Sequence, residues 1–178
     1  PATMSEEERL SVISRVVSCT NCRVPVIAGT GSNTTEGAAA FTRKVTDLGV
    51  DGMLVVTPYY NKATQKGLVA HFTAIADAVN IPIILYNVPS RTGCGFDVAT
   101  VKELSKHKNI AAIKEASGNL EQVDEIIKNK PDDFDVISGD DSLTFPMISC
   151  GAVGVISVIG NALPKEFSKM IRLECRGE

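Results

Sequence analysis

The chain has 178 residues, of which 44% are hydrophobic and 22% are charged, and its net charge is −3. This composition is typical of a globular protein and excludes an intrinsically disordered chain. The sequence has no cluster of basic residues for a phosphate backbone and no apolar run long enough to span a bilayer, so we expect neither a nucleic-acid nor a membrane partner. Residues 1–8 lack the basic and apolar regions of a signal peptide, and we therefore expect a cytoplasmic protein.

Helical and strand-like segments alternate along the chain. The first helix is expected to begin after the N-cap Ser5, with Glu8 completing a capping box. Its apolar face consists of Leu10, Ile13, Val16 and Val17. Short apolar runs predict strands at 24–28, 53–56, 82–86, 110–113, 134–137 and 153–157. Helical periodicity occupies 35–48, 65–79, 97–107, 119–129, 142–150 and the segment from 164 onward.

This alternation predicts a parallel α/β fold in one domain, residues 1–178. The first four apolar runs start at 24, 53, 82 and 110, which corresponds to one βα unit per step. Gly29 and Gly31 imitate the start of a dinucleotide fingerprint, but Thr34 replaces its last glycine and Thr57-Pro58 replaces the expected acid. We therefore favour a (β/α)8 barrel that is incomplete in this chain, with its first two strands and its C-terminal helices absent.

Polar residues gather where the predicted strands end, which is where parallel barrels hold their reactive groups. Lys114 closes an apolar strand on the same face as Ala112, and burial there would favour a neutral, nucleophilic amine. The alternative is a lysine that reaches solvent or pairs with Glu115. Tyr86 ends another strand on the same face as Ile84, either as a proton relay or as an amphipathic core residue.

The loops that follow add a cation and two aromatic residues. Arg91 would bind a carboxylate with two hydrogen bonds, or would be an ordinary solvated loop cation. The adjacent Tyr59 and Tyr60 are typical of an interface. Cys19 and Cys22 form a C-x-x-C pair without a second ligand pair, so we interpret them as incidental rather than as a redox or zinc site, and we predict no metal.

These loops together resemble the dihydrodipicolinate synthase family, in the N-acetylneuraminate lyase superfamily of pyruvate aldolases. The resemblance covers essentially the whole chain. The segments that carry it are Gly29-Thr-Gly-Ser-Asn, Thr57-Pro-Tyr-Tyr-Asn-Lys, Leu85-Tyr-Asn-Val-Pro-Ser-Arg-Thr-Gly and Ile113-Lys-Glu-Ala-Ser-Gly. It implies a (β/α)8 barrel that forms a homotetramer of two tight dimers and works without metal or organic cofactor.

The resemblance also implies a role for each residue. Lys114 would form a Schiff base with pyruvate, Tyr86 would relay protons, and Tyr60 would complete the relay in the neighbouring subunit. Arg91 would hold the carboxylate of aspartate 4-semialdehyde, while backbone around Gly139 and Ile156 would line the pyruvate pocket. Asn33 and Tyr59 match a regulatory lysine site at the dimer interface. Gly37 stands where that site has its acid, so we do not predict inhibition by lysine.

The implied reaction condenses pyruvate with aspartate 4-semialdehyde to 4-hydroxy-tetrahydrodipicolinate, in lysine and diaminopimelate biosynthesis. One rival is another pyruvate-dependent 2-keto-acid aldolase, similar to N-acetylneuraminate lyase. The Ser-Arg-Thr version of the Arg91 loop favours the synthase, because the lyases that act on sugar acids do not carry it. An inactive barrel fragment kept for interaction and a nucleotide-binding module also remain open.

Overall fold

The computed structural model describes residues 3–177 and confirms the parallel α/β organisation. One parallel sheet in sequence order contains β1 (Ile27–Gly29), β2 (Gly52–Val56), β3 (Ile83–Asn87), β4 (Ile110–Glu115) and β5 (Asp135–Ser138). The α-helices are α1 (Glu6–Thr20), α2 (Thr35–Thr46), α3 (Gln65–Ala76), α4 (Pro89–Thr92), α5 (Val98–Leu104), α6 (Leu120–Asn129), α7 (Thr144–Cys150) and α8 (Pro164–Glu174). A 3-10 turn, η1 (Ile159–Asn161), precedes α8.

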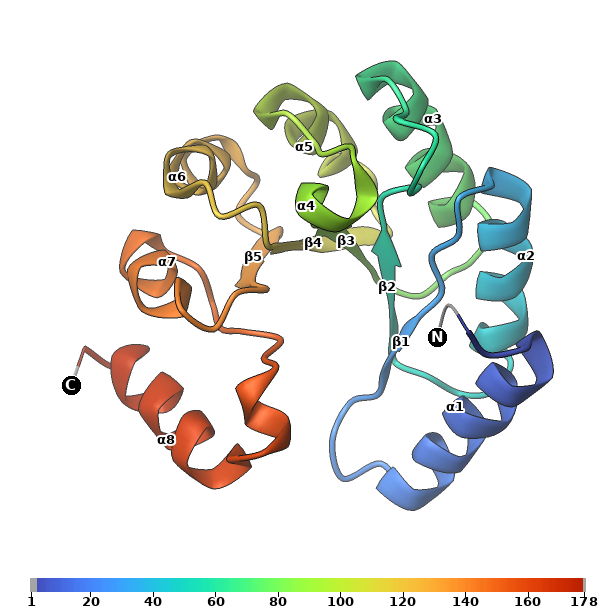
Figure 1. Cartoon of the computed structure of the whole chain (residues 1–178), viewed down its shortest axis with the longest axis horizontal. Coiled ribbons are helices and arrows are strands. Elements are labelled where there is room, and N and C mark those ends of the chain that lie inside the picture. Colours follow the sequence, from blue (N-terminus) through green and yellow to red (C-terminus); the bar gives the residue numbers. More distant parts are fainter. Residues whose placement is uncertain (1–2, 178) are drawn as a thin grey trace.

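The strands form the inside of an open arc, and the helices cover its outside, with α1 and α8 at the two ends (Figure 1). Side chains alternate between the two faces of each strand, so every second residue packs under the helices. These helix-facing side chains are fully buried and include Met53, Val55, Leu85, Ile113 and Val136. The residues between them point to the concave face, where the arc leaves them less covered.

The first helix begins as predicted, but its apolar face differs from the prediction. The Ser5 hydroxyl accepts from the backbone N–H of Glu8, and the Glu8 carboxylate accepts from the N–H of Ser5, which confirms the capping box. Leu10, Ile13 and Val17 pack against the core, whereas Val16 is 46% exposed and does not belong to the apolar face. The helix lies at one end of the arc (Figure 1).

The prediction of a sixth strand at 153–157 is wrong. This segment lies beside β5 and forms three backbone hydrogen bonds with it. The N–H groups of Val153, Ser138 and Ile156 donate to the carbonyls of Val136, Gly154 and Ser138, respectively. It makes only one isolated bridge, between Ser138 and Val155. Within residues 3–177 it has no strand on its other side, so its pairing stays at one edge.

A one-turn helix, α4, replaces part of the loop expected after β3. Pro89 begins it, because proline has the backbone angle of a first helical residue and has no N–H to leave unpaired. Gly93 ends it in the left-handed conformation, at φ 74°. Arg91 therefore lies on a helical turn that is fixed at both ends.

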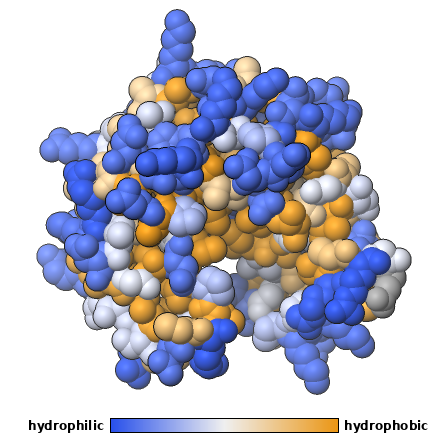
Figure 2. Space-filling view, turned by 180° about the vertical axis from the view of Figure 1, so that it is seen from behind, coloured by the Kyte–Doolittle hydropathy of each residue, from blue (hydrophilic) through white to orange (hydrophobic). Residues whose placement is uncertain are grey.

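Apolar surface gathers around the hollow of the arc in the view from behind (Figure 2). Large apolar side chains are also exposed near the two ends of the arc, at Val24 and Ile27 before and in β1 and at Val158 and Leu163 around η1. Within residues 3–177 no helix has the length and hydropathy needed to cross a bilayer.

Acid is expected to weaken the fold through His71, which is buried on α3. Its Nδ1 lies 2.9 Å from the Thr35 hydroxyl, and its Nε2 has no hydrogen-bond partner in the described structure. Burial lowers the pKa of His71, so the unfolded chain binds its proton more readily than the folded chain does. The free energy of unfolding is therefore not reduced by His71 above the unfolded pKa of about 6.5. As the pH falls below that value, the free energy of unfolding decreases by at most about 1.4 kcal/mol per pH unit.

His71→Gln should make this loss shallower, because glutamine does not titrate. Urea unfolding at pH 7.5 and pH 5.5 measures the effect, with His107 unchanged in both proteins. Equal pH dependence in the variant and the parent protein would contradict the assignment to His71.

Candidate active site

Lys114 and Tyr86 lie side by side at the carboxyl ends of β4 and β3. They are register partners in the parallel sheet, and both point to the concave face. The Lys114 Nζ lies 4.3 Å from the centroid of the Tyr86 ring. Lys114 is only 9% exposed, and Glu115 points to the opposite face, so the alternative of a solvent-exposed lysine paired with Glu115 is wrong.

Burial sets the chemistry of the Lys114 amine. It lowers the pKa of Lys114 because an ammonium loses hydration there, and the negative charge of Asp141 opposes this shift. A lowered pKa raises the fraction of neutral amine, which is the nucleophilic form. The geometry therefore provides an amine that can attack a carbonyl group.

Asp141 was not singled out from the sequence, although it lies in one of the strand-end loops. Its carboxylate accepts from the backbone N–H groups of Val158 and Ile159, at 3.1 and 2.8 Å. Desolvation raises the pKa of Asp141, but bonds from Ser157 and these two amides, with the charge of Lys114, lower it overall. Asp141 is thus an anion that fixes the turn after residues 153–157 and acts electrostatically on Lys114.

Gly139, directly after β5, leaves the space that Lys114 occupies. A Cβ at this position would lie 2.8 Å from the Lys114 Cε and 2.9 Å from the Ala116 Cβ. The Gly139 N–H donates to the Glu115 carbonyl at 2.8 Å, so the backbone cannot retreat without losing that bond. The lysine and the glycine therefore fit each other sterically.

Gly139→Ala is expected to slow the reaction of Lys114 with a keto acid by about tenfold to about a hundredfold, because a displacement of about 1 Å costs that much. Borohydride trapping with pyruvate measures the rate. Gly29→Ala is the control for stability, since its Cβ would meet nothing within 4 Å. A Gly139→Ala protein that reacts at the parent rate would show that this close approach is not needed.

Arg91 lines a cleft of about 420 Å³ together with Tyr86, Tyr59 and Val56. Arg9, from α1, lines the same cleft and was not found from the sequence, because the pattern of the first helix does not distinguish it from an ordinary helix-surface cation. Its guanidinium lies 3.8 Å from the Phe41 ring centroid and donates to the Gly29 carbonyl. Arg91 is exposed and lines this cleft, which suits capture of an incoming anion.

Other predicted residues lie around this centre. Tyr60 is 89% exposed, has a φ of 77°, and its N–H donates to the Thr92 carbonyl, so within the described chain it is not brought to Lys114 and Tyr86. Ile156 is half-buried beside β5. The Asn33 carbonyl accepts from the Asn61 amide at 2.9 Å, which links the loops that carry Asn33 and Tyr59.

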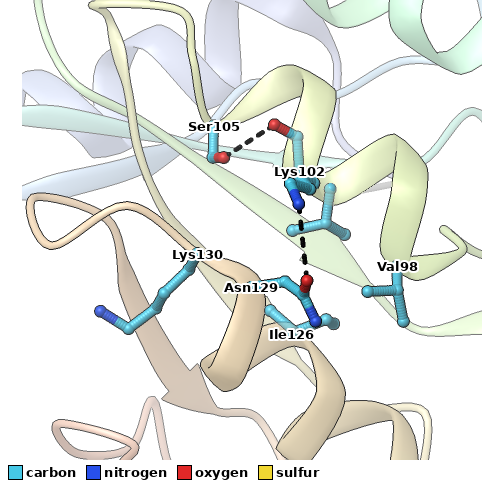
Figure 3. A pocket seen from close by; sticks show the side chains of 7 residues that line it. Val98, Lys102, Ser105, Ile126, Asn129 and Lys130 are labelled. Atoms are coloured by element: carbon cyan, nitrogen blue, oxygen red, sulfur yellow. Dashed lines mark hydrogen bonds between the residues drawn. The ribbon is translucent and has the colours of Figure 1, made fainter.

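Another groove lies between α5 and α6, away from these residues (Figure 3). Val98 and Ile126 face each other across it, and the Lys102 ammonium approaches the Asn129 amide oxygen at 3.5 Å. It is a seam of helix packing. Within residues 3–177 there is also no cluster of three or more side chains that could hold a metal ion.

Comparison with known proteins places the whole chain in one family. The model of the "Dihydrodipicolinate synthetase family" matches residues 1–178. The chain is 57% identical over 164 residues to the 4-hydroxy-tetrahydrodipicolinate synthase of Geobacter sulfurreducens, covering 92% of this chain and 57% of that protein. It is 50% identical over 177 residues to the synthase of Phocaeicola vulgatus, covering 99% and 60%.

Solved structures agree with this assignment. Dihydrodipicolinate synthase from Aquifex aeolicus superposes with a TM-score of 0.97 at 46% identity, over 99% of this chain and 60% of that one. The chloride-inhibited enzyme from Acinetobacter baumannii, complexed with pyruvate, gives 0.95 at 43% identity, over 97% and 60%. The chain thus has the α/β architecture of this family's (β/α)8 barrels, and it spans about three-fifths of the length of these relatives.

Proposed function

The chain belongs to the dihydrodipicolinate synthetase family, and we propose that it forms the Schiff-base centre of a 4-hydroxy-tetrahydrodipicolinate synthase. The observation that carries the proposal is the Lys114 amine, buried against the Tyr86 ring at the carboxyl ends of neighbouring strands. The substrates are pyruvate and aspartate 4-semialdehyde, and the product enters lysine and diaminopimelate biosynthesis. The relatives bearing this name support that choice over another 2-keto-acid aldolase.

The reaction begins with attack of the neutral Lys114 amine on the ketone carbon of pyruvate. The resulting carbinolamine loses water to give an imine, which tautomerises to an enamine. The enamine carbon adds to the aldehyde of aspartate semialdehyde, and the substrate amine then displaces Lys114 as the ring closes. Each proton transfer needs a group beside the nitrogen, and the Tyr86 hydroxyl is the candidate for that relay.

The remaining residues shape the site around this chemistry. Backbone around Gly139 and Ile156 lines the pyruvate pocket. The exposed Tyr60 reaches into the site of a neighbouring subunit, and the assembly is a homotetramer built as a dimer of dimers. The five cysteines are free thiols, which supports a reducing, cytoplasmic location. We expect residues 1–178 to belong to one domain.

Borohydride trapping with pyruvate, followed by peptide mass spectrometry, tests the proposal. A reduced pyruvyl adduct on Lys114 is the expected result, and a folded protein without this adduct would overturn it. A screen of aldehydes with pyruvate, in a turnover assay without borohydride, distinguishes the synthase from its rivals. Faster consumption of a sugar aldehyde than of aspartate semialdehyde would favour the N-acetylneuraminate lyase type of reaction.

Arg91→Ala is expected to raise the half-saturating concentration of aspartate semialdehyde by about tenfold to about a hundredfold, because it removes a charge-assisted bond to the carboxylate of that substrate. The half-saturating concentration of pyruvate should rise less. Steady-state kinetics with each substrate varied in turn measures both, and Arg91→Lys should give an intermediate effect. Equal changes for the two substrates would contradict the role of Arg91.

A further inference from the structure

A second pair of polar residues lies directly behind Lys114 and Tyr86. Asn87 and Glu115 are the next register partners along β3 and β4, and both are 1% exposed. The Asn87 amide donates to the Glu115 carboxylate at 2.8 Å. Because side chains alternate along a strand, this pair faces away from Lys114 and Tyr86 and does not line the cleft.

Three further hydrogen bonds extend the pair into the neighbouring loops. The Ser117 N–H donates to the other oxygen of Glu115 at 2.6 Å, and the Phe96 N–H donates to the Asn87 amide oxygen at 3.2 Å. The Ala116 N–H donates to the Asn87 carbonyl at 2.9 Å. A Cβ on Gly95 would lie 3.0 Å from the Asn87 oxygen, so the loop after α4 approaches this pair as closely as a glycine allows.

The pair thus joins the strand ends that carry the reactive groups. The Glu115 carbonyl also accepts from Gly139, which brings the end of β5 into the same network. Each member is the chain neighbour of Tyr86 or Lys114, so holding Asn87 and Glu115 still fixes the direction in which those two side chains leave the backbone. A buried carboxylate costs more than an apolar side chain of similar size, and packing alone would not require one.

We propose that Asn87 and Glu115 are positioning residues that hold Tyr86 and Lys114 in register for imine formation. This inference rests on the proposed Schiff-base function. The hydrogen bond between the two side chains requires a donor at Asn87 and an acceptor at Glu115. The same arrangement can also be made with the donor and the acceptor exchanged between the two strands.

Glu115→Gln, Asn87→Asp and the double exchange Asn87→Asp/Glu115→Gln test the inference in the intact protein. In Glu115→Gln, the oxygen of the introduced amide can still accept from the Ser117 N–H. Its NH2 group then faces the NH2 group of Asn87, and two donors cannot form a hydrogen bond. In Asn87→Asp, two carboxyl groups are in contact. In the double variant, the amide introduced on β4 donates to the carboxylate introduced on β3, while the bonds from Ser117 and Phe96 remain possible.

The measurement is the rate of borohydride-trapped adduct formation at saturating pyruvate, well below the melting temperature of every variant. Each single variant should lose about tenfold to about a hundredfold in this rate. The half-saturating pyruvate concentration should change less. The double variant should return to within about threefold of the parent protein, as coupled residues do in a double-mutant cycle.

A purely structural role would change the melting temperatures and leave the saturated rate per folded molecule unaltered, and that result would overturn the inference. A folded double variant that is no faster than the single variants would overturn it as well. Absence of an adduct in the parent protein is a different failure. It would remove the Schiff-base function itself, and the positioning role with it.

Discussion

Lys114→Ala should abolish the pyruvyl adduct and the turnover that depends on it. Imine formation needs a primary amine whose nitrogen is uncharged, and alanine provides none. Another lysine cannot replace Lys114, because the 9% exposed position that suppresses its ammonium form is a property of this strand end. The expected result is complete loss of the labelled peptide in the mass spectrum.

Lys169→Ala is the matched control, because Lys169 lies exposed on α8 and should keep the adduct at the parent yield. Circular dichroism of both variants shows whether the fold is retained. Lys114 is buried beside the Tyr86 ring, so its truncation leaves a space there as well as removing the nucleophile. A folded Lys114→Ala protein with near-normal turnover would rule out the proposed role.

The pairing of Lys114 with Tyr86 shows where sequence reasoning works. The period of two along a strand correctly predicted that Lys114 shares a face with Ala112, and Tyr86 with Ile84. It did not predict that the two residues are adjacent. Ile83 pairs with Ile110 and Ile84 pairs with Ala112, so β4 holds one additional residue at this point. Without that shift Tyr86 would lie opposite Ile113.

The register shift between β3 and β4 also explains why Asn87 and Glu115 were not found from the sequence. Their hydrogen bond joins residues 28 positions apart, and it depends on the irregular register between β3 and β4. A glutamate after a lysine is usually a solvated surface residue, so its type alone gives no signal. The prediction of a sixth strand was wrong for a different reason. An apolar pattern indicates that a segment is buried, but it does not indicate whether the segment has a neighbouring strand on both sides.

Tyr86→Phe should slow imine formation by about a hundredfold to about ten-thousandfold, the range over which a positioned acid–base group contributes. Phenylalanine keeps the ring against which the Lys114 amine packs at 4.3 Å and removes only the hydroxyl. The desolvation of Lys114 should therefore persist while the proton relay is lost. Single-turnover trapping with pyruvate measures the rate, and thermal unfolding measures the stability.

The two interpretations of Tyr86 give opposite results in this variant. If the hydroxyl were only the polar end of a core tyrosine, its removal would change stability and leave the rate of trapping unaltered. If it relays protons, the rate falls while the melting temperature stays near that of the parent protein.

Tyr59→Phe, on the same cleft, is a second informative change. Tyr59 lines this cleft with Arg91 and Tyr86, and no described contact joins it to Lys114, so we expect its effect on the rate to be smaller.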